Sequence, residues 1–161
     1  MTWLPPIVEM AGDWDAYCDQ LFQIFERDLR AARFFGRRVS RRRTPEVNGK
    51  PDGFWHVTSE HFDKNSEDRV PDLRRCERVP WIGPMIDAAG TDRVLCFRSP
   101  RPVKFGHNVV IALPNMSYVV ILGVRNGRDG LYMVLVTAFP PRGRRKDEFR
   151  QQYEAQGDYQ P

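Results

Sequence analysis

Residues 117–139 read SYVVILGVRNGRDGLYMVLVTAF, and this stretch decides the fold. It holds two runs rich in Val, Ile, Leu and aromatic residues, which are the residue types enriched in β-strands. The segment RNGRDG between the runs has the glycines and short polar residues of a tight hairpin connection. The stretch therefore predicts two antiparallel strands, and it places Thr137 in the second of them.

Two similar runs precede this hairpin, RVLCFR at 93–98 and NVVIAL at 108–113. Together the four runs predict a strongly twisted antiparallel sheet in the C-terminal half of the chain. After Pro140-Pro141 the chain becomes polar, and Phe149 and Tyr153 lie four residues apart. This spacing predicts a short helix on the outside of the sheet.

The N-terminal part shows a helical period. Apolar residues recur every three or four positions from Tyr17 to Leu29, and Asp13 is suited to be the N-cap. We expect a helix that ends near Gly36, and a second, short helix in PDLRRCERV at 71–79. By contrast, FWHVTS at 54–59 alternates between apolar and polar residues, which predicts a strand that carries His56.

The segment 37–53 is strongly basic and has no steady apolar period. Nine basic residues lie between positions 27 and 50, against two acidic ones, in a chain of net charge +4. Asn48-Gly49 and Pro51-Asp52-Gly53 are turn sequences. We therefore expect a basic loop, with one edge strand around Val39 at most. Clustered arginines of this kind favour a polyanionic partner, although a solvated surface gives the same pattern.

These elements predict an α+β protein, with N-terminal helices packed on one twisted antiparallel sheet of about four to five strands and a short C-terminal helix. The length of 161 residues fits a single domain. Its expected parts are a helix at 13–36, a basic loop at 37–53, a core with the sheet at 54–139, and a polar helix and tail at 140–161.

Several classes of protein are disfavoured by the sequence. The chain lacks a phosphate-binding GxxxxGK[ST] motif, GxGxxG, HExxH and GxSxG. The three cysteines are widely spaced and form no CxxC pair that could bind zinc. His61 and Asp63 have no evident third ligand, so we expect no metal and no cofactor. No apolar stretch is long enough to span a bilayer, and no export signal is evident, so we expect a soluble cytoplasmic protein without membrane contact.

The remaining reactive groups suit metal-free cleavage of RNA. Histidine moves protons near neutral pH, because its ordinary pKa is near 6.5. Arginine binds a phosphate with two parallel hydrogen bonds, and a Thr or Tyr hydroxyl donates a neutral one. These residue types are common, so each one also has an ordinary structural interpretation.

The order of the motifs adds a resemblance. FWHVTSEHF, DLRRCERVPWIGPMI, YVVIL and YMVLVTAF, followed by a polar helix, resemble the nuclease superfamily of barnase, EndoU, the tRNA-cleaving colicins and RelE, especially its phage- and toxin-associated branches. The resemblance covers residues 54–155 and leaves the N-terminal helix unmatched. It implies a helical part on a four-stranded antiparallel sheet, and RNA cleavage that leaves a 2′,3′-cyclic phosphate.

The resemblance also implies the site. His56 would be the general base or acid, Arg78 would contact the scissile phosphate with Arg75 as the alternative, and Thr137 would hydrogen-bond the transition state. Tyr118 is a weaker candidate for the same pocket. One more cation would come from a middle strand, where Arg98 and Lys104 both fit. Five arginines would hold the RNA backbone: Arg37, Arg38, Arg41, Arg42 and Arg43.

The leading hypothesis is therefore a toxin-type endoribonuclease that acts on tRNA or mRNA, with Trp55 or Phe139 stacking single-stranded bases. An acidic antitoxin or immunity protein would be a second partner. Two alternatives stay open: a non-catalytic RNA- or DNA-binding module that uses the arginines, and a protein-interaction domain that uses a sheet edge.

Overall fold

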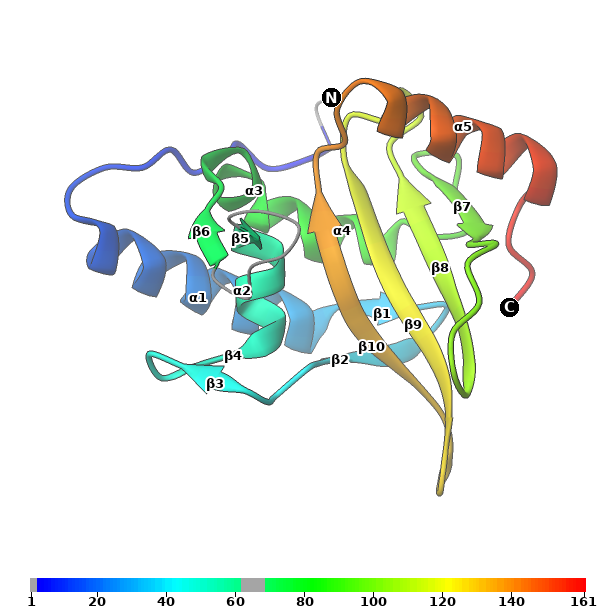
Figure 1. The fold of residues 1–161 in the computed structure, drawn as a ribbon, viewed down its shortest axis with the longest axis horizontal. Coiled ribbons are helices and arrows are strands. Elements are labelled where there is room, and N and C mark those ends of the chain that lie inside the picture. Colours follow the sequence, from blue (N-terminus) through cyan, green and yellow to red (C-terminus); the bar gives the residue numbers. More distant parts are fainter. Residues whose placement is uncertain (1–2, 62–68) are drawn as a thin grey trace.

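The computed structural model describes residues 3–61 and 69–161, and within them it shows an α+β fold, as predicted (Figure 1). The helices are α1 (Trp14–Ala31), α2 (Asp52–Thr58), α3 (Leu73–Glu77), the 3₁₀ turn η1 (Val79–Trp81), α4 (Ile82–Asp87) and α5 (Arg144–Gln156). The strands are β1 (Arg33–Phe34), β2 (Arg37–Arg41), β3 (Glu46–Val47), β4 (Lys50–Pro51), β5 (Ser59–His61), β6 (Arg69–Pro71), β7 (Leu95–Arg98), β8 (Gly106–Ala112), β9 (Val119–Gly127) and β10 (Gly130–Phe139).

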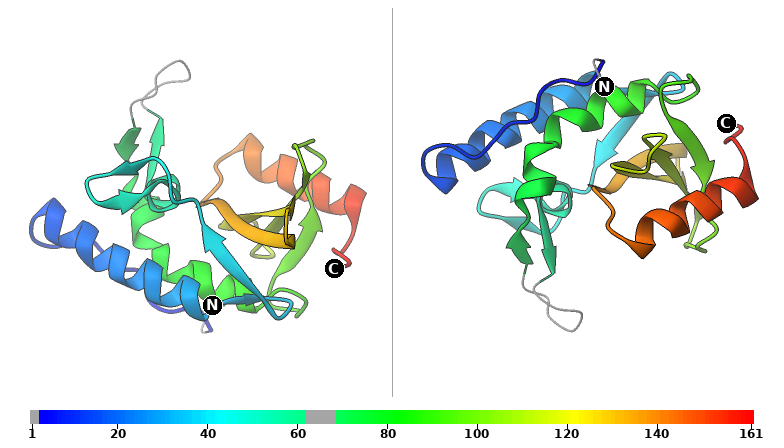
Figure 2. Two further views of the ribbon diagram at one scale, coloured as in Figure 1. Left: turned by 90° about the horizontal axis from the view of Figure 1, so that it is seen from below. Right: turned by 90° about the horizontal axis from the view of Figure 1, so that it is seen from above.

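The four C-terminal strands pair antiparallel, as their sequences predict. The main sheet has the order β1-β2-β10-β9-β8-β7 among the described strands, and it curls strongly (Figures 1 and 2). The hairpin between β9 and β10 closes with Gly127 opposite Gly130. A β-bulge lies between Leu135 and Thr137, and such a bulge redirects the residues that follow it.

The predicted sheet of four to five antiparallel strands is wrong in size and in type. Six described strands form it, and β2 runs parallel to β10, with Val39 opposite Met133. Ser40 Oγ donates a hydrogen bond to the Met133 carbonyl at 3.0 Å. The strand expected around Val39 is present as β2, but it lies between β1 and β10 rather than at an edge, with the Val39 side chain buried. The rest of the expected loop at 37–53 holds β3, β4 and the first residues of α2.

The predicted strand at FWHVTS is also wrong, since residues 54–58 belong to helix α2 and only Ser59 lies in a strand, β5. Phe54, Val57 and Thr58 are buried on one side of the helix, which is the spacing of three and four that a helix requires. The segment has only six residues, and apolar side chains at 54, 55 and 57 fit the period of a helix as well as that of a strand. Pro51 precedes the helix at the N-cap position, where proline is compatible with the backbone.

The core lies between the sheet and helices α1 and α4, while α5 covers the opposite face at one end (Figure 2). Helix α1 begins after Asp13, whose Oδ1 accepts a hydrogen bond from the amide of Ala16 at 2.8 Å. It ends at Ala31 rather than near Gly36, because the chain turns there into β1. Phe149 of α5 is buried against the sheet. None of the described helices is long and apolar enough to cross a membrane.

Candidate active site

Helix α2 is fixed against two strands of the sheet. The amide of Gly53 donates to the Arg42 carbonyl at 2.9 Å, and a Cβ on Gly53 would lie only 3.1 Å from the Arg42 amide nitrogen. Glycine therefore permits this close approach. On the other side, Thr137 Oγ1 of β10 donates to the His56 carbonyl at 3.1 Å. These contacts set the position of the His56 side chain relative to the sheet.

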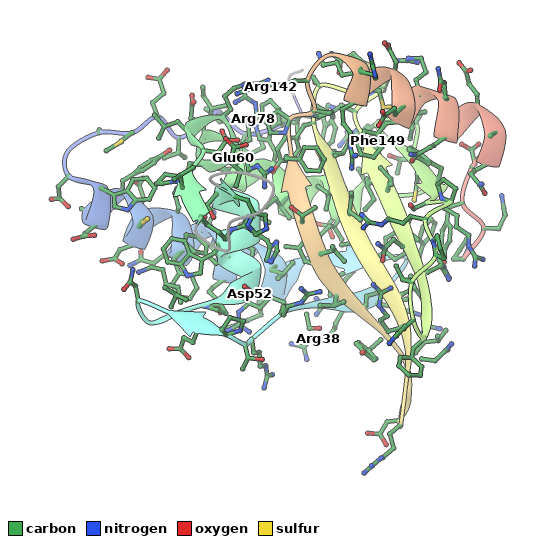
Figure 3. The ribbon with its side chains drawn as sticks, in the orientation of Figure 1. Arg38, Asp52, Glu60, Arg78, Arg142 and Phe149 are labelled. Carbon is green, nitrogen blue, oxygen red and sulfur yellow. The ribbon has the colours of Figure 1, made fainter. Side chains whose placement is uncertain are left out.

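His56 and Thr137 line one open pocket of about 410 Å³ beside β10. Figure 3 shows Asp52 near the start of α2 and Glu60 beyond its end, and Glu60 is one of the lining residues. The residues that line it, from here on the His56 pocket, are His56, Glu60, His61, Arg69, Arg75, Val136, Thr137, Phe139 and Arg145. They come from separate parts of the chain, so the fold gathers titratable and cationic groups around one hollow.

The imidazole of His56 is partly buried and lies among charged groups. Its Nε2 is 3.2 Å from Asp52 Oδ2. Burial lowers the pKa of His56, as do Arg69 and Arg42, while Asp52 raises it. The balance keeps the imidazole neutral at pH 7, which is the form that accepts a proton. The Asp52 carboxylate is then placed to stabilise the imidazolium that forms.

Arg75 and Arg69 bind the backbone where α2 ends. Arg75 Nη1 donates to the carbonyls of His56 at 3.0 Å and Ser59 at 2.9 Å. Arg69 donates through Nε to Ser59 Oγ at 2.9 Å and lies 3.3 Å from His61 Nε2 through Nη1. Both guanidinium groups therefore sit at the pocket wall with their positions fixed by hydrogen bonds.

A third cation reaches the pocket from α5. The guanidinium of Arg145 lies 5.8 Å from the Phe139 ring centre and 5.0 Å from that of Phe149, and Arg75 stacks on Phe139 at 5.2 Å. The Phe139 ring is thus in contact with two guanidinium groups rather than free to stack a base. The indole of Trp55 donates to the Val47 carbonyl at 3.0 Å, which fixes the other predicted stacking residue.

Two of the four predicted catalytic residues do not line the His56 pocket. Arg78 stacks on Trp81 at 5.2 Å, and its Nη1 donates to the Arg74 carbonyl at 3.0 Å, so the alternative Arg75 is the arginine at the pocket. Tyr118 is fully buried, its ring packs edge-on against Trp81, and burial raises its pKa. Tyr118 immediately precedes β9, and its side chain joins the core cluster to which Val120 and Leu122 of that strand belong.

The predicted phosphate-binding cations are spread over several sites. Arg98 at the end of β7 and Lys104 before β8 are exposed, and neither lines the His56 pocket. Arg37 lines a separate cavity of about 720 Å³ near His107 and Tyr159. Arg41 pairs with Glu26 of α1. Arg38 and Arg43 line a surface pocket on β2, and Arg42 Nη1 lies 3.8 Å from Asp52 Oδ2.

Four residues with charged or titratable side chains in the pocket were not predicted as catalytic or RNA-binding: Glu60, His61, Arg69 and Arg145. The signal for the first two is their spacing from His56, four and five residues, once FWHVTS is recognised as a helix that leads into a strand. Arg69 and Arg145 have no local signal, because tertiary structure alone brings them here. Within residues 3–61 and 69–161, no group of three His, Cys, Asp or Glu is placed to bind a metal ion, and Asp63 lies outside these ranges.

Comparison with models of protein families, with curated proteins and with solved structures finds no significant match to this chain.

Proposed function

We propose that this protein is a metal-independent endoribonuclease whose active site is the His56 pocket. The observation that carries the proposal is the meeting of a histidine of lowered pKa with three arginines and the Thr137 hydroxyl in one hollow. A base and a set of cations are groups that cleavage by the RNA 2′-hydroxyl requires, and the Thr137 hydroxyl holds the backbone of the base in place.

In the proposed reaction, neutral His56 takes the proton of the 2′-hydroxyl as that oxygen attacks phosphorus. The bond from phosphorus to the 5′-oxygen breaks, and the leaving oxygen receives a proton from one of the two other titratable groups of the pocket, Glu60 or His61. The products are a 2′,3′-cyclic phosphate and a free 5′-hydroxyl.

The three arginines stabilise the charge that grows on the phosphorane. Arg69 and Arg75 are held by hydrogen bonds to backbone and side-chain groups of the α2 end, so they need little reorganisation during the reaction. Arg145, half-exposed on α5, lines the same hollow. In keeping with the resemblance in residues 54–155, we propose that the enzyme acts as a toxin on tRNA or mRNA and is neutralised by an acidic protein.

The test uses total RNA in the presence of EDTA, with end-group analysis of the fragments. Wild-type protein and His107→Ala should both give fragments that end in 2′,3′-cyclic phosphate, whereas His56→Ala should give none. His107 is the matched control, because it is a half-buried histidine whose pKa is also lowered by burial but which lines a different cavity. Cleavage by His56→Ala at the wild-type rate would overturn the proposal.

A further inference from the structure

The face of the sheet that points away from α1 and α4 is open below α5. Val124, Met133 and Leu135 point into the core on the α1 side, so Tyr132 and Val134 between them point to the other face. Phe149 of α5 covers that face at one end. At the other end, Tyr132 is 49% exposed, and Figure 1 shows no described element over β9 and β10 there.

Two planar side chains lie flat on this face because glycines leave room beneath them. A Cβ on Gly127 would lie 2.9 Å from Cε1 of Tyr132, and a Cβ on Gly123 would lie 2.8 Å from Cζ of Arg125. Tyr132 and Arg125 are directly opposite each other in the register of β9 and β10. From these positions the two side chains lean in opposite directions along β9, the ring over Gly127 and the guanidinium over Gly123. They form two separate flat surfaces on one face of the sheet, and each rests on backbone.

The guanidinium of Arg125 is fixed in this position by hydrogen bonds. Its Nη2 donates to Asn108 Oδ1 at 2.8 Å, and its Nη1 donates to the His107 carbonyl at 2.8 Å. An arginine that is held by its edges in this way presents its planar face outward. Guanidinium faces and aromatic rings are the two kinds of surface on which nucleobases stack.

Phosphate-binding groups lie beside the planar groups. Arg38 and Arg43 line a surface pocket of about 380 Å³ together with Tyr132, and Figure 3 shows Arg38 at this end of the sheet. Strand β10 continues from Tyr132 to Val136 in the His56 pocket, a distance of roughly 13 Å at the usual rise of a strand. The open face and the His56 pocket are thus two ends of one surface.

We propose that Tyr132 and Arg125 form a stacking platform for single-stranded RNA that leads into the His56 pocket. This inference rests on the proposed function. The bases of a duplex stack on one another and expose only their edges, whereas a single strand can lay its bases on a flat platform and its phosphates against Arg38 and Arg43. The positive rim favours a nucleic acid.

The test measures binding with a probe that cannot be cut. A fluorescent 2′-O-methyl oligoribonucleotide of about ten nucleotides suits a site of this size, in salt near 0.15 M. Tyr132→Ala should weaken binding roughly 5- to 100-fold, as expected for the loss of one stacked base. Tyr132→Phe should bind like the wild type. Gly123→Val should also weaken binding, because its side chain displaces the Arg125 guanidinium.

Leu131→Ala is the matched control, because Leu131 is 50% exposed and lies on the opposite face of the same strand. It should bind the probe like the wild type. The platform is overturned if Tyr132→Ala binds the single strand as tightly as Leu131→Ala does. It is also overturned if Tyr132→Ala weakens the binding of a duplex of the same sequence as much as it weakens the binding of the single strand. It is also overturned if Tyr132→Ala loses affinity for a polyglutamate peptide while it keeps its affinity for the probe, since the face would then serve an acidic protein.

These outcomes separate the platform from the nuclease. Tyr132-dependent binding of the probe by a protein that leaves total RNA intact would support the platform and overturn the nuclease. Cleavage of RNA by a protein whose affinity for the probe does not depend on Tyr132 would do the reverse.

Discussion

Thr137 Oγ1 donates a hydrogen bond to the backbone carbonyl of His56, with the two atoms 3.1 Å apart. The two residues are 81 positions apart in the chain, and the bond joins α2 to β10 at the rim of the pocket. The hydroxyl proton is engaged in this bond, so in this structure Thr137 positions His56. A direct role toward a phosphate stays a prediction.

Thr137→Val should destabilise the protein by about 1 kcal/mol, because the isosteric side chain removes one hydrogen bond and Arg75 still donates to the same carbonyl. Thr137→Ser should restore most of this loss. Urea unfolding measures the change, and cleavage assays on the same variants show whether the hydroxyl matters beyond its structural role. Equal stability of the valine and wild-type proteins would contradict the assigned bond.

Arg75 and Arg78 should behave differently when each is replaced by alanine. Arg75→Ala removes two hydrogen bonds to carbonyls and a cation of the pocket, so it should lower stability by roughly 2–4 kcal/mol and also abolish cleavage. Arg78→Ala should leave the cleavage rate within a few fold of wild type, since Arg78 does not line the pocket. A larger loss of cleavage in Arg78→Ala than in Arg75→Ala would reverse the assignment.

Tyr118→Phe should leave cleavage unchanged. The Tyr118 hydroxyl is buried and has no hydrogen-bond partner among the described residues. Removal of such a group relieves a desolvation cost, so the variant should be as stable as the wild type or more stable by about 1 kcal/mol. Thermal unfolding and RNA cleavage measure the two effects. A large loss of cleavage in a folded variant would return Tyr118 to the site.

The pH profile should report on His56. Because burial and Arg69 lower its pKa, the acidic limb of kcat/KM should lie below pH 6.5, the ordinary value for histidine. Asp52→Asn removes a group that raises this pKa and should move the limb to lower pH. Arg42→Gln removes a group that lowers it and should move the limb to higher pH. NMR titration of the His56 ring provides the same comparison without RNA.

Stability should depend on pH through the same histidine. The unfolded chain binds a proton near pH 6.5, while folded His56 binds it only at lower pH. The contribution of neutral His56 is therefore complete above pH 6.5 and is lost as the pH falls through the folded value. In urea unfolding between pH 8 and 5, the free energy of unfolding should fall less with decreasing pH in His56→Gln than in the wild type. An equal loss would mean that His56 keeps its ordinary pKa.

The sequence was sufficient for elements whose signal is local. The hairpin of β9 and β10 was predictable because its two apolar strands flank their own turn. FWHVTS was misread as a strand because so short a segment fits both periods. The choice of a helix depends on the core into which Phe54 and Val57 pack, where Phe54 meets Phe22 and Phe25 of α1. Arg69 and Arg145 could not be predicted as pocket residues from the sequence, because only the tertiary structure brings them near α2.

The parallel pairing of β2 with β10 has a consequence for how the chain reaches its native state. Ser40 and the carbonyl that it contacts on Met133 are 93 residues apart. Contacts of such separation close large loops and form late in folding. During synthesis, β2 must wait for β10 to leave the ribosome. The most arginine-rich segment of the chain is therefore made well before its parallel partner strand, and until then only the short strand β1 is available to pair with it.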